Sequence, residues 1–414
     1  MSEWKKVKLS KGKTYGGLSG KSAKDFISGD SPYVTFMEVL SNVKLTKPPT
    51  AKVKIKFGES QNAVKKNDLL LNGSSETPEE VAIPTSVNFS PDIPIYLNSF
   101  CFGYRPDTDD IDSDFLSYFL RSSEGREIIV QLAAGSTRYN ISKRSFTNLE
   151  LLLPPLPEQQ RIARVLGDID DEIATLEELV AKKRLVKTAV MQQLLTGKVR
   201  LTADGRAVTG ADIERERQLG HLHNWRRVKL GEIGEIAMCK RIMKHQTSET
   251  GEIPFYKIGT FGKAPDAFIT REIFDRYSAM YKYPNKGDIL LSAAGTIGRA
   301  VVFDGKPAYF QDSNIVWLQN NEKIVSNKFL AYVYKRVKWT TSDTTISRLY
   351  NDLLSNIEIF IPTDKSEQTR IADILTDIDD DIAIHETLIS KKRRVKTGVM
   401  QQLLTGKTRL LEAA

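Results

Sequence analysis

One long charged segment occurs twice in this chain. It reads EQQRIARVLGDIDDEIATLEELVAKKRLVKTAVMQQLLTGK from Glu158 and EQTRIADILTDIDDDIAIHETLISKKRRVKTGVMQQLLTGK from Glu367. Both copies contain VMQQLLTGK without a single change, which chance similarity does not explain. A repeat of this length indicates that the fold contains two related parts. A chain of 414 residues is also long enough for at least two separate cores.

Each copy has the apolar spacing of one long helix. Pro157 and Glu158 suit a first helical turn, and Gly197 and Gly406 stand where a left-handed residue ends a helix. We therefore expect two helices of about 38 residues each. Their apolar residues recur at steps of three and four and so lie along one face. This stripe contains Ile162, Val165, Leu166, Ile169, Ile173, Leu176, Leu179, Val180, Val186 and Val190 in the first copy, and Ile371, Ile374, Leu375, Ile378, Ile382, Leu388, Ile389, Val395 and Val399 in the second.

The two helices are predicted to pack on each other as a coiled coil, because neither can bury its stripe alone. A parallel or an antiparallel pair is possible, and we favour the antiparallel one, which gives the chain a pseudo-two-fold symmetry. His385 replaces Leu176 on the stripe, where we expect a register-setting or partly exposed residue rather than a functional histidine. Asp168, Asp170 and Asp171 are expected on the exposed face as solvated charge.

The segments before the two helices correspond more loosely. WKKVKL at Trp4 matches WRRVKL at Trp225, and SDFLSYFLRS from Ser113 matches NKFLAYVYKR from Asn327. Each segment contains short β-rich runs, a short helix, a polar loop and an apolar exit strand. The predicted fold class is therefore α+β, with two similar mixed α/β domains and two long helices. The predicted boundaries are 1–155 for the first domain, 156–200 for the first helical region, 201–224 for a polar and irregular linker, 225–363 for the second domain and 364–410 for the second helical region.

Composition points to a cytosolic protein with a polyanionic partner. The net charge of +8 favours binding to phosphate, because basic surface releases condensed counterions. Only two cysteines occur, Cys101 and Cys239, which indicates a reducing compartment rather than a disulfide framework. The segment MSEWKKVKLS has no apolar core of a secretory signal, and no apolar run is long enough to cross a membrane.

The chain resembles the specificity (S) subunit of type I restriction-modification systems. The resemblance is carried by the repeated EQxRIA and KKRxVKTxVMQQLLTGKxRL motifs and by LPPLPEQQ from Leu153, and it covers essentially the whole chain. The second helix entry, IPTDKSEQ from Ile361, lacks the double proline. The resemblance implies two target-recognition domains, each reading one half of a split, asymmetric sequence in double-stranded DNA, and helices that dock two methyltransferase subunits. We further expect the helices to set the spacer between the two half-sites.

The same resemblance implies partners and cofactors outside this chain. Endonuclease and translocase subunits would join through the complex, which would use S-adenosylmethionine, and ATP and Mg for restriction. This chain itself is expected to hold no cofactor and no metal, since TYGGLSGKS has Tyr15 where a P-loop needs glycine. LPPL at Leu153 lacks the amide and the ring of a base-methylating motif, and His221 and His223 have no further ligands nearby. We therefore expect a non-catalytic subunit.

Base contacts are expected from polar loops that present paired donors and acceptors. In the first domain the candidates are Lys21, Lys24, Asn72, Ser74, Arg138, Tyr139, Asn140, Lys143 and Arg144. In the second they are Lys257, Lys263, Ser292, Thr296, Arg299, Gln311, Asn314, Ser347, Arg348, Tyr350 and Asn351. For the basic runs KKRLVK from Lys182 and KKRRVK from Lys391 there are three alternatives: contact with phosphate, contact with a partner subunit, or a solvated helix face. The alternative function is a scaffold that binds proteins through its paired domains, which selective retention on DNA would distinguish.

Overall fold

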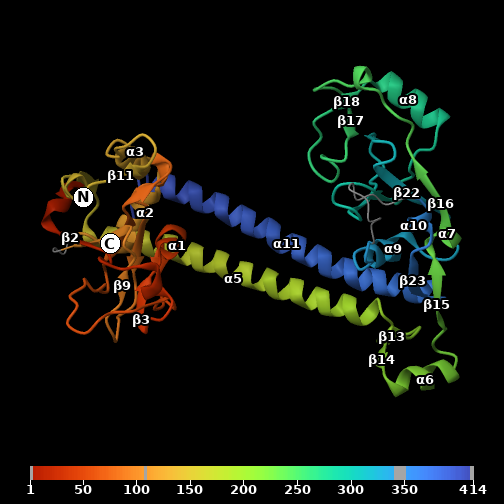
Figure 1. Cartoon of the computed structure of the whole chain (residues 1–414), viewed down its shortest axis with the longest axis horizontal. Helices are drawn as coiled ribbons and strands as arrows, with labels where there is room; N and C mark the ends of the chain where they lie inside the picture. Colours follow the sequence, from red (N-terminus) through yellow and green to blue (C-terminus); the bar gives the residue numbers. More distant parts are fainter. Residues whose placement is uncertain (1–2, 107–109, 340–350, 411–414) are drawn as a thin grey trace. The chain divides into compact units, whose positions relative to one another are not determined.

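The structure is a computed structural model that describes residues 3–106, 110–339 and 351–410 (Figure 1). The chain divides into two compact units. Unit 1 contains Met1–Glu178 and Thr387–Ala414, and unit 2 contains Leu179–Glu386. Each unit therefore combines one globular domain with part of both long helices.

The two repeated segments form the long helices α5 (Leu156–Leu194) and α11 (Lys365–Leu403), each of 39 residues. This confirms the predicted helices and their length. Gly197 and Gly406 follow them with φ angles of 70° and 72°, the left-handed conformation expected at the stop. A Cβ atom at Gly197 would lie 3.4 Å from the ring of Trp225, and one at Gly406 would lie 3.1 Å from the ring of Trp4. A tryptophan thus covers the end of each long helix.

Within each unit the two helices run antiparallel, as predicted. In unit 1 the Nζ of Lys392 lies 2.8 Å from Glu172, whereas the Nζ of Lys396, one turn further along, lies 2.6 Å from Asp170. Residue numbers therefore rise on one helix as they fall on the other. In unit 2, Lys183 pairs with Asp381 and Lys187 with Asp379 in the same manner.

These ion pairs correct two expectations about charge on the helices. Two lysines of each basic run bind carboxylates of the opposite helix, so the runs are not merely solvated. Contact of the runs with phosphate or a partner subunit stays a prediction. Asp170 is half-buried and also accepts a hydrogen bond from the Tyr118 hydroxyl at 2.8 Å, so it is not solvated charge. Asp171 pairs with Lys44 at 3.2 Å. Helical spacing alone does not show which charges a neighbouring helix or domain reaches.

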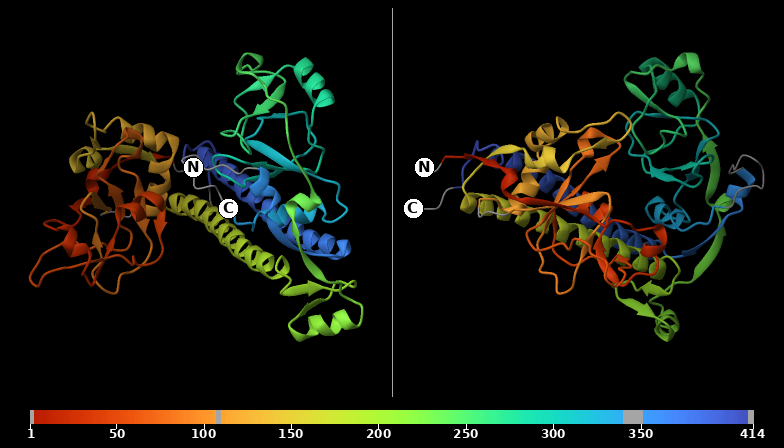
Figure 2. Two further views of the ribbon diagram at one scale, coloured as in Figure 1. Left: turned by 45° about the vertical axis from the view of Figure 1, so that its right-hand side comes forward. Right: turned by 60° about the vertical axis from the view of Figure 1, so that its left-hand side comes forward.

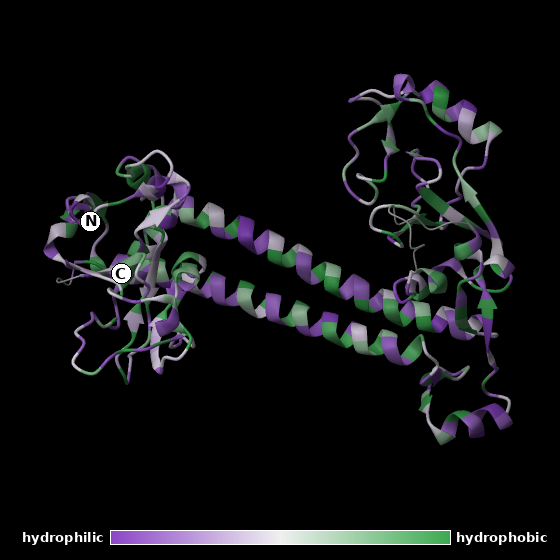
Figure 3. Cartoon of the chain, viewed as in Figure 1, coloured by the Kyte–Doolittle hydropathy of each residue, from purple (hydrophilic) through white to green (hydrophobic). Residues whose placement is uncertain are grey.

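The buried seam is narrower than the predicted apolar stripe. Ile173 and Ile389 in unit 1, and Val180 and Ile382 in unit 2, are buried. In contrast, six members of the stripe are exposed: Val165, Leu388 and Val395 in unit 1, and Ile374, Leu179 and Val186 in unit 2. Figure 3 shows hydrophobic residues between the polar ones along both helices. A single partner helix covers only a narrow line of side chains, which leaves the flanks of the stripe in contact with solvent.

The domain of unit 1 is built on a five-stranded sheet of order β2-β10-β6-β8-β4. A three-stranded sheet, β5-β3-β9, packs nearby, and β1 pairs with β12 where the chain enters and leaves the domain. The strands are β1 (Lys5–Lys8), β2 (Lys13–Gly16), β3 (Ser31–Val34), β4 (Lys44–Leu45), β5 (Lys52–Val53), β6 (Leu69–Asn72), β7 (Ser74–Ser75), β8 (Pro84–Val87), β9 (Tyr96–Leu97), β10 (Cys101–Arg105), β11 (Tyr139–Asn140) and β12 (Glu150–Leu153). The helices are η1 (Leu9–Lys11), η2 (Ala23–Phe26), α1 (Phe36–Ser41), η3 (Pro78–Glu80), α2 (Ser113–Arg121), α3 (Ser123–Val130) and α4 (Lys143–Thr147).

The domain of unit 2 repeats this plan. Its main sheet has the order β16-β22-β19-β20, its three-stranded sheet is β18-β17-β21, and β15 pairs with β23. In both three-stranded sheets the middle strand has one antiparallel and one parallel neighbour. The strands are β15 (Trp225–Lys229), β16 (Gly234–Met238), β17 (Ile253–Tyr256), β18 (Phe268–Ile269), β19 (Ile289–Ser292), β20 (Ala300–Val302), β21 (Tyr309–Phe310), β22 (Ile315–Asn320) and β23 (Glu358–Pro362). The helices are α7 (Leu230–Ile233), η4 (Lys244–Gln246), α8 (Arg271–Met280), α9 (Asn327–Tyr334) and α10 (Asn351–Ser355). Figure 2 shows both domains from two further directions.

The segment predicted to be irregular is ordered, so that prediction is wrong. It contains β14 (Ala207–Thr209), which forms a hairpin with β13 (Val199–Leu201) at its start, and then α6 (Ala211–Gln218). Polar contacts hold it together: the Arg206 guanidinium lies 2.7 Å from Asp204 and 3.5 Å from Glu216. The residues that make these contacts are polar and form no periodic apolar pattern, so the sequence does not indicate that the segment is ordered.

Candidate nucleic-acid interface

The first turn of each long helix contains a glutamate that is bound by an arginine from beyond the end of the other helix. In unit 2 the Glu367 carboxylate accepts hydrogen bonds from Nε and Nη2 of Arg200, both at 2.7 Å. In unit 1 the Glu158 carboxylate accepts the same two bonds from Arg409, at 2.7 and 2.6 Å. Both glutamates are buried. The pairs tie the start of one helix to the chain that follows the other.

The glutamine after each glutamate anchors the adjoining domain. The Gln159 side chain accepts from the Asp112 backbone N–H at 2.9 Å and donates to the Pro154 carbonyl at 2.9 Å. Gln368 makes the matching bonds with Ser326 and Pro362, also at 2.9 Å. The repeated Glu-Gln pair therefore positions the loop before α2 in unit 1 and the loop before α9 in unit 2. Its repetition in the sequence was the available signal for this role, which the sequence analysis did not assign.

Five of the predicted DNA-binding residues in unit 1 come together beside β7. Strand β11 places Tyr139 opposite Ser75 and Asn140 opposite Ser74. The Arg138 guanidinium lies over the Phe100 ring, 5.4 Å from its centre. Helix α4 follows directly and presents Lys143 and Arg144 to solvent. These residues form one polar, basic surface that is accessible to a ligand.

The other four candidates in unit 1 lie in different surroundings. Asn72 is fully buried, where its side chain accepts from the Ile83 N–H and donates to the Glu80 carbonyl, both at 2.6 Å. Ser74 is buried beside it. The Lys21 side chain is only 3% exposed and pairs with Glu59, whereas Lys24 is exposed. Asn72, Ser74 and Lys21 thus shape the loops on which other residues are displayed.

In unit 2, four predicted residues line a single small cavity. Lys263, Ser292, Thr296 and Arg299 surround a volume of about 260 Å³. The Arg299 side chain donates to the Phe261 carbonyl at 2.7 Å, and its backbone N–H donates to the Ser292 hydroxyl at 2.9 Å. These bonds fix the shape of the glycine-containing loop between β19 and β20.

The remaining candidates of unit 2 lie partly beside this cavity. The Gln311 side chain accepts from the backbone N–H of Ile258, a residue of the cavity wall, at 2.9 Å. The Asn314 carbonyl accepts from the Ala293 N–H at 2.7 Å. Lys257 pairs with Asp266 at 2.9 Å. Asn351 is the first residue of α10, while Ser347, Arg348 and Tyr350 lie outside the described residues.

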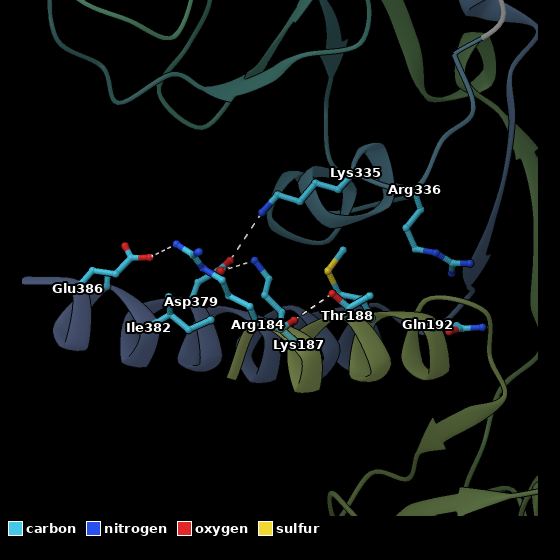
Figure 4. A pocket seen from close by; sticks show the side chains of 11 residues that line it. Arg184, Lys187, Thr188, Gln192, Lys335, Arg336, Asp379, Ile382 and Glu386 are labelled. Carbon is cyan, nitrogen blue, oxygen red and sulfur yellow. Dashed lines mark hydrogen bonds and ion pairs between the residues drawn. The ribbon is translucent and has the colours of Figure 1, made fainter. Parts of the chain in front are cut away.

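A second, larger cleft of unit 2 borders the long helices (Figure 4). It has a volume of about 750 Å³ and is lined mainly by charged residues of α5, α11 and the end of α9. Lys187 and Lys335 both point to Asp379, and Arg184 points to Glu386. Burial and the nearby Lys187 ammonium lower the pKa of Lys335. The lining residues are Arg184, Lys187, Thr188, Met191, Gln192, Lys335, Arg336, Asp379, Ile382, Ala383 and Glu386.

Two kinds of feature are missing from the part of the chain that the structure describes. No group of three or more histidine, cysteine, aspartate or glutamate side chains there could hold a metal ion. None of its helices is both long and apolar enough to span a membrane.

The model of the family described as "Type I restriction modification DNA specificity domain" matches residues 1–183 and 223–391. The chain belongs to this family. Each matched range of the specificity-domain family covers one globular domain and most of the long helix that follows it. The internal repeat of the sequence is therefore a repeat of the family's own unit.

Individual members of the specificity-domain family are similar to this chain over much of its length. A putative type I restriction enzyme specificity subunit of Haemophilus influenzae is 41% identical over 266 residues, which is 64% of each chain. This chain thus aligns with slightly less than two thirds of that relative. The putative type I restriction enzyme MjaX specificity subunit of Methanocaldococcus jannaschii is 26% identical over 74% of this chain and 70% of its own.

A solved structure supports the same fold. The S subunit of a type I restriction-modification system from M. genitalium superposes with a TM-score of 0.57 and 16% identity. The superposition covers 97% of this chain and 96% of that one. The α+β architecture with two long helices is thus the fold of this specificity-domain chain.

Proposed function

We propose that this chain is the DNA sequence-specificity subunit of a type I restriction-modification complex and that it has no catalytic role of its own. The observation that carries the proposal is the family match over both domains, combined with a polar, partly basic surface in each domain. The similarity to the specificity subunits from Haemophilus influenzae and Methanocaldococcus jannaschii supports the proposal.

We propose that each domain reads one half of an asymmetric DNA target. In unit 1 the reading surface would be the segment from Arg138 to Arg144 with β7. In unit 2 it would be the cavity lined by Lys263, Thr296 and Arg299 with its neighbours. The two surfaces present different side chains on the same scaffold, so the two half-sites would differ in sequence.

The helices would dock two methyltransferase subunits. Support comes from the exposed apolar residues, which occur as two sets at equivalent positions of the repeat. Val165 and Ile374 are 36% and 37% exposed, and Val186 and Val395 are 56% and 46% exposed. Leu179 and Leu388 complete the two sets. One apolar set in each unit suits two copies of one partner.

The chemistry would belong to these partners. Methyl transfer by the complex would use S-adenosylmethionine, and restriction by the endonuclease and translocase subunits would use ATP and Mg. The complex would act in the cytoplasm on double-stranded DNA, and the long helices would set the spacer between the half-sites.

Methylation mapping tests the proposal. The chain is expressed with its methyltransferase subunits in a host that lacks other modification, and methylated bases are located across the genome. We expect a split motif with two different halves, and no methylation without this chain. If the chain is instead a protein-binding scaffold, it will assemble with partners while methylation and selective retention on DNA are the same with and without it.

A further inference from the structure

An aromatic side chain stands fully exposed at the tip of a tight turn in unit 1. The turn runs from Lys56 to Glu59 after strand β5, beside β3, which is labelled in Figure 1. The Glu59 N–H donates to the Lys56 carbonyl at 3.1 Å, and Gly58 has a φ of 75°. Phe57 lies between them with a relative exposure of 107%. A single phenylalanine belongs to no sequence pattern, so only the structure reveals that this ring is exposed.

The turn is braced so that it keeps its shape. The Glu59 carboxylate accepts hydrogen bonds from Lys21 Nζ at 2.6 Å, Gln61 Nε2 at 2.6 Å and the Lys56 N–H at 2.9 Å. Lys21 also donates to the Lys54 carbonyl at 2.7 Å. The Lys21 ammonium is the largest cause that lowers the pKa of Glu59 to about 2, so the carboxylate stays charged. The buried Lys21 side chain and the charged Glu59 carboxylate thus keep the Phe57 ring exposed to solvent. In a loose loop the ring could pack against the protein surface instead.

The surroundings of the ring are basic. Lys54 and Lys56 flank it in the sequence, and Lys24 lies on the neighbouring segment, whose Asp25 carbonyl accepts from the Lys54 N–H at 2.7 Å. All three lysines are exposed, and within the described residues none of the three forms an ion pair. Two carboxylates of the adjoining segments, Asp25 and Glu59, accept hydrogen bonds from Ser22 and Lys21. An apolar tip among free ammonium groups suits a partner with stacked rings and phosphates, which is duplex DNA.

Other phenylalanines of the described residues are less exposed than Phe57. Phe261 of unit 2 is 1% exposed, and the exposed Phe100 of unit 1 lies under the Arg138 guanidinium. Phe57 therefore differs from the other phenylalanines named here in having neither a core nor a cation against its face.

We propose that Phe57 is a wedge that inserts between two neighbouring base pairs of the DNA bound by unit 1, while Lys24, Lys54 and Lys56 contact the flanking phosphates. This inference rests on the proposed function. Apolar side chains inserted between base steps unstack and kink a duplex, and flexible pyrimidine–purine steps deform most easily. Unit 1 would then select part of its half-site through deformability, at a step where no base edge is read.

The test uses the complex of the full chain with its methyltransferase subunits, on the target found by methylation mapping. Duplexes carry 2-aminopurine at successive positions of the half-site, because its fluorescence rises when it is unstacked. Methyltransferase subunits extrude their target base, so a rise at that base is expected with every variant. We expect a second rise, at one other step, with the natural chain and with Phe57→Trp, and its loss with Phe57→Ala. Phe57→Ala should also weaken binding by about 5- to 160-fold, the range for one lost base–aromatic stack. Met280→Ala, which removes an exposed apolar side chain from unit 2, should leave the signal unchanged.

The outcomes separate the wedge from the proposed function. If the natural complex shows no selective DNA binding, the proposed function fails. If it binds selectively but no second position brightens, or if Phe57→Ala binds and brightens like the natural chain, the wedge is refuted while the function stands. If Phe57→Ala loses a methyltransferase copy in native mass spectrometry and still unstacks DNA, the turn is a protein contact and the wedge is again refuted.

Discussion

Replacing Glu367 by alanine should weaken unit 2 strongly. The Glu367 side chain is 1% exposed and that of Arg200 is 6% exposed. Besides two bonds from Arg200, the carboxylate accepts from the Leu201 N–H at 3.2 Å and from the Trp225 indole at 3.3 Å. Without it, the His223 carbonyl at 2.6 Å is the one hydrogen-bond acceptor that the described residues leave to the buried guanidinium.

A buried cation that loses its partner destabilises a protein by about 3–5 kcal/mol. For a unit of roughly this size each kcal/mol lowers the midpoint of thermal unfolding by about 2–4 °C, so we expect a fall of about 6–20 °C. The repeat supplies a matched comparison. Arg409, the partner of Glu158, is 26% exposed, so water can reach it once the carboxylate is gone. Glu158→Ala should therefore destabilise unit 1 by about half as much.

Thermal unfolding that is monitored by hydrogen exchange of peptides from each unit measures the destabilisation caused by Glu367→Ala and by Glu158→Ala. Replacing Glu367 and Arg200 together by methionine should recover most of the lost stability, since no unpaired charge stays buried. The reasoning is refuted if Glu367→Ala destabilises its unit no more than Glu158→Ala does, or if the double variant is as unstable as the single one.

Four further outcomes are expected. Val186→Asp and Val395→Asp should each remove one methyltransferase copy without unfolding the chain, which native mass spectrometry measures. Loss of both copies from either variant would contradict two separate binding sites for the methyltransferase subunits. Exchanging residues 1–155 for another recognition domain should change one half of the methylated motif and leave the other. Four helix-forming residues inserted after Leu195 should lengthen the spacer by about one or two base pairs, measured by selection from a randomised DNA library. The hydrogen bonds to the Glu59 carboxylate should be fully formed above its ordinary pKa of 4.5 and be lost as the pH falls toward 2. NMR titration of the Glu59 carboxyl carbon measures this, and a titration near pH 4.5 would show that Lys21 does not bind the carboxylate.

The candidate site was only partly predictable from residue types. Lysine, arginine, asparagine and serine in polar loops can pair with base edges, and Lys143 and Arg144 do lie exposed on α4. Asn72 has the same chemistry, but the Glu80 carbonyl and the Ile83 N–H take up its side chain. Whether a polar group faces solvent or completes a loop depends on the backbone that folds against it, which local sequence does not reveal.

The sequence by itself determined the two long helices, their stops, the doubling of the domains and the family. These properties are written in local periodicity and in direct repetition, which need no knowledge of neighbours. Only the tertiary structure decided which apolar residues of the stripe are buried, which charges are paired and which ring is exposed. Asp170 pairs with Lys396, which lies about two hundred positions away along the chain. Val186 is exposed, although it belongs to the same apolar stripe as residues that are buried. Contacts over such a separation arise from packing, and no pattern within one segment records them.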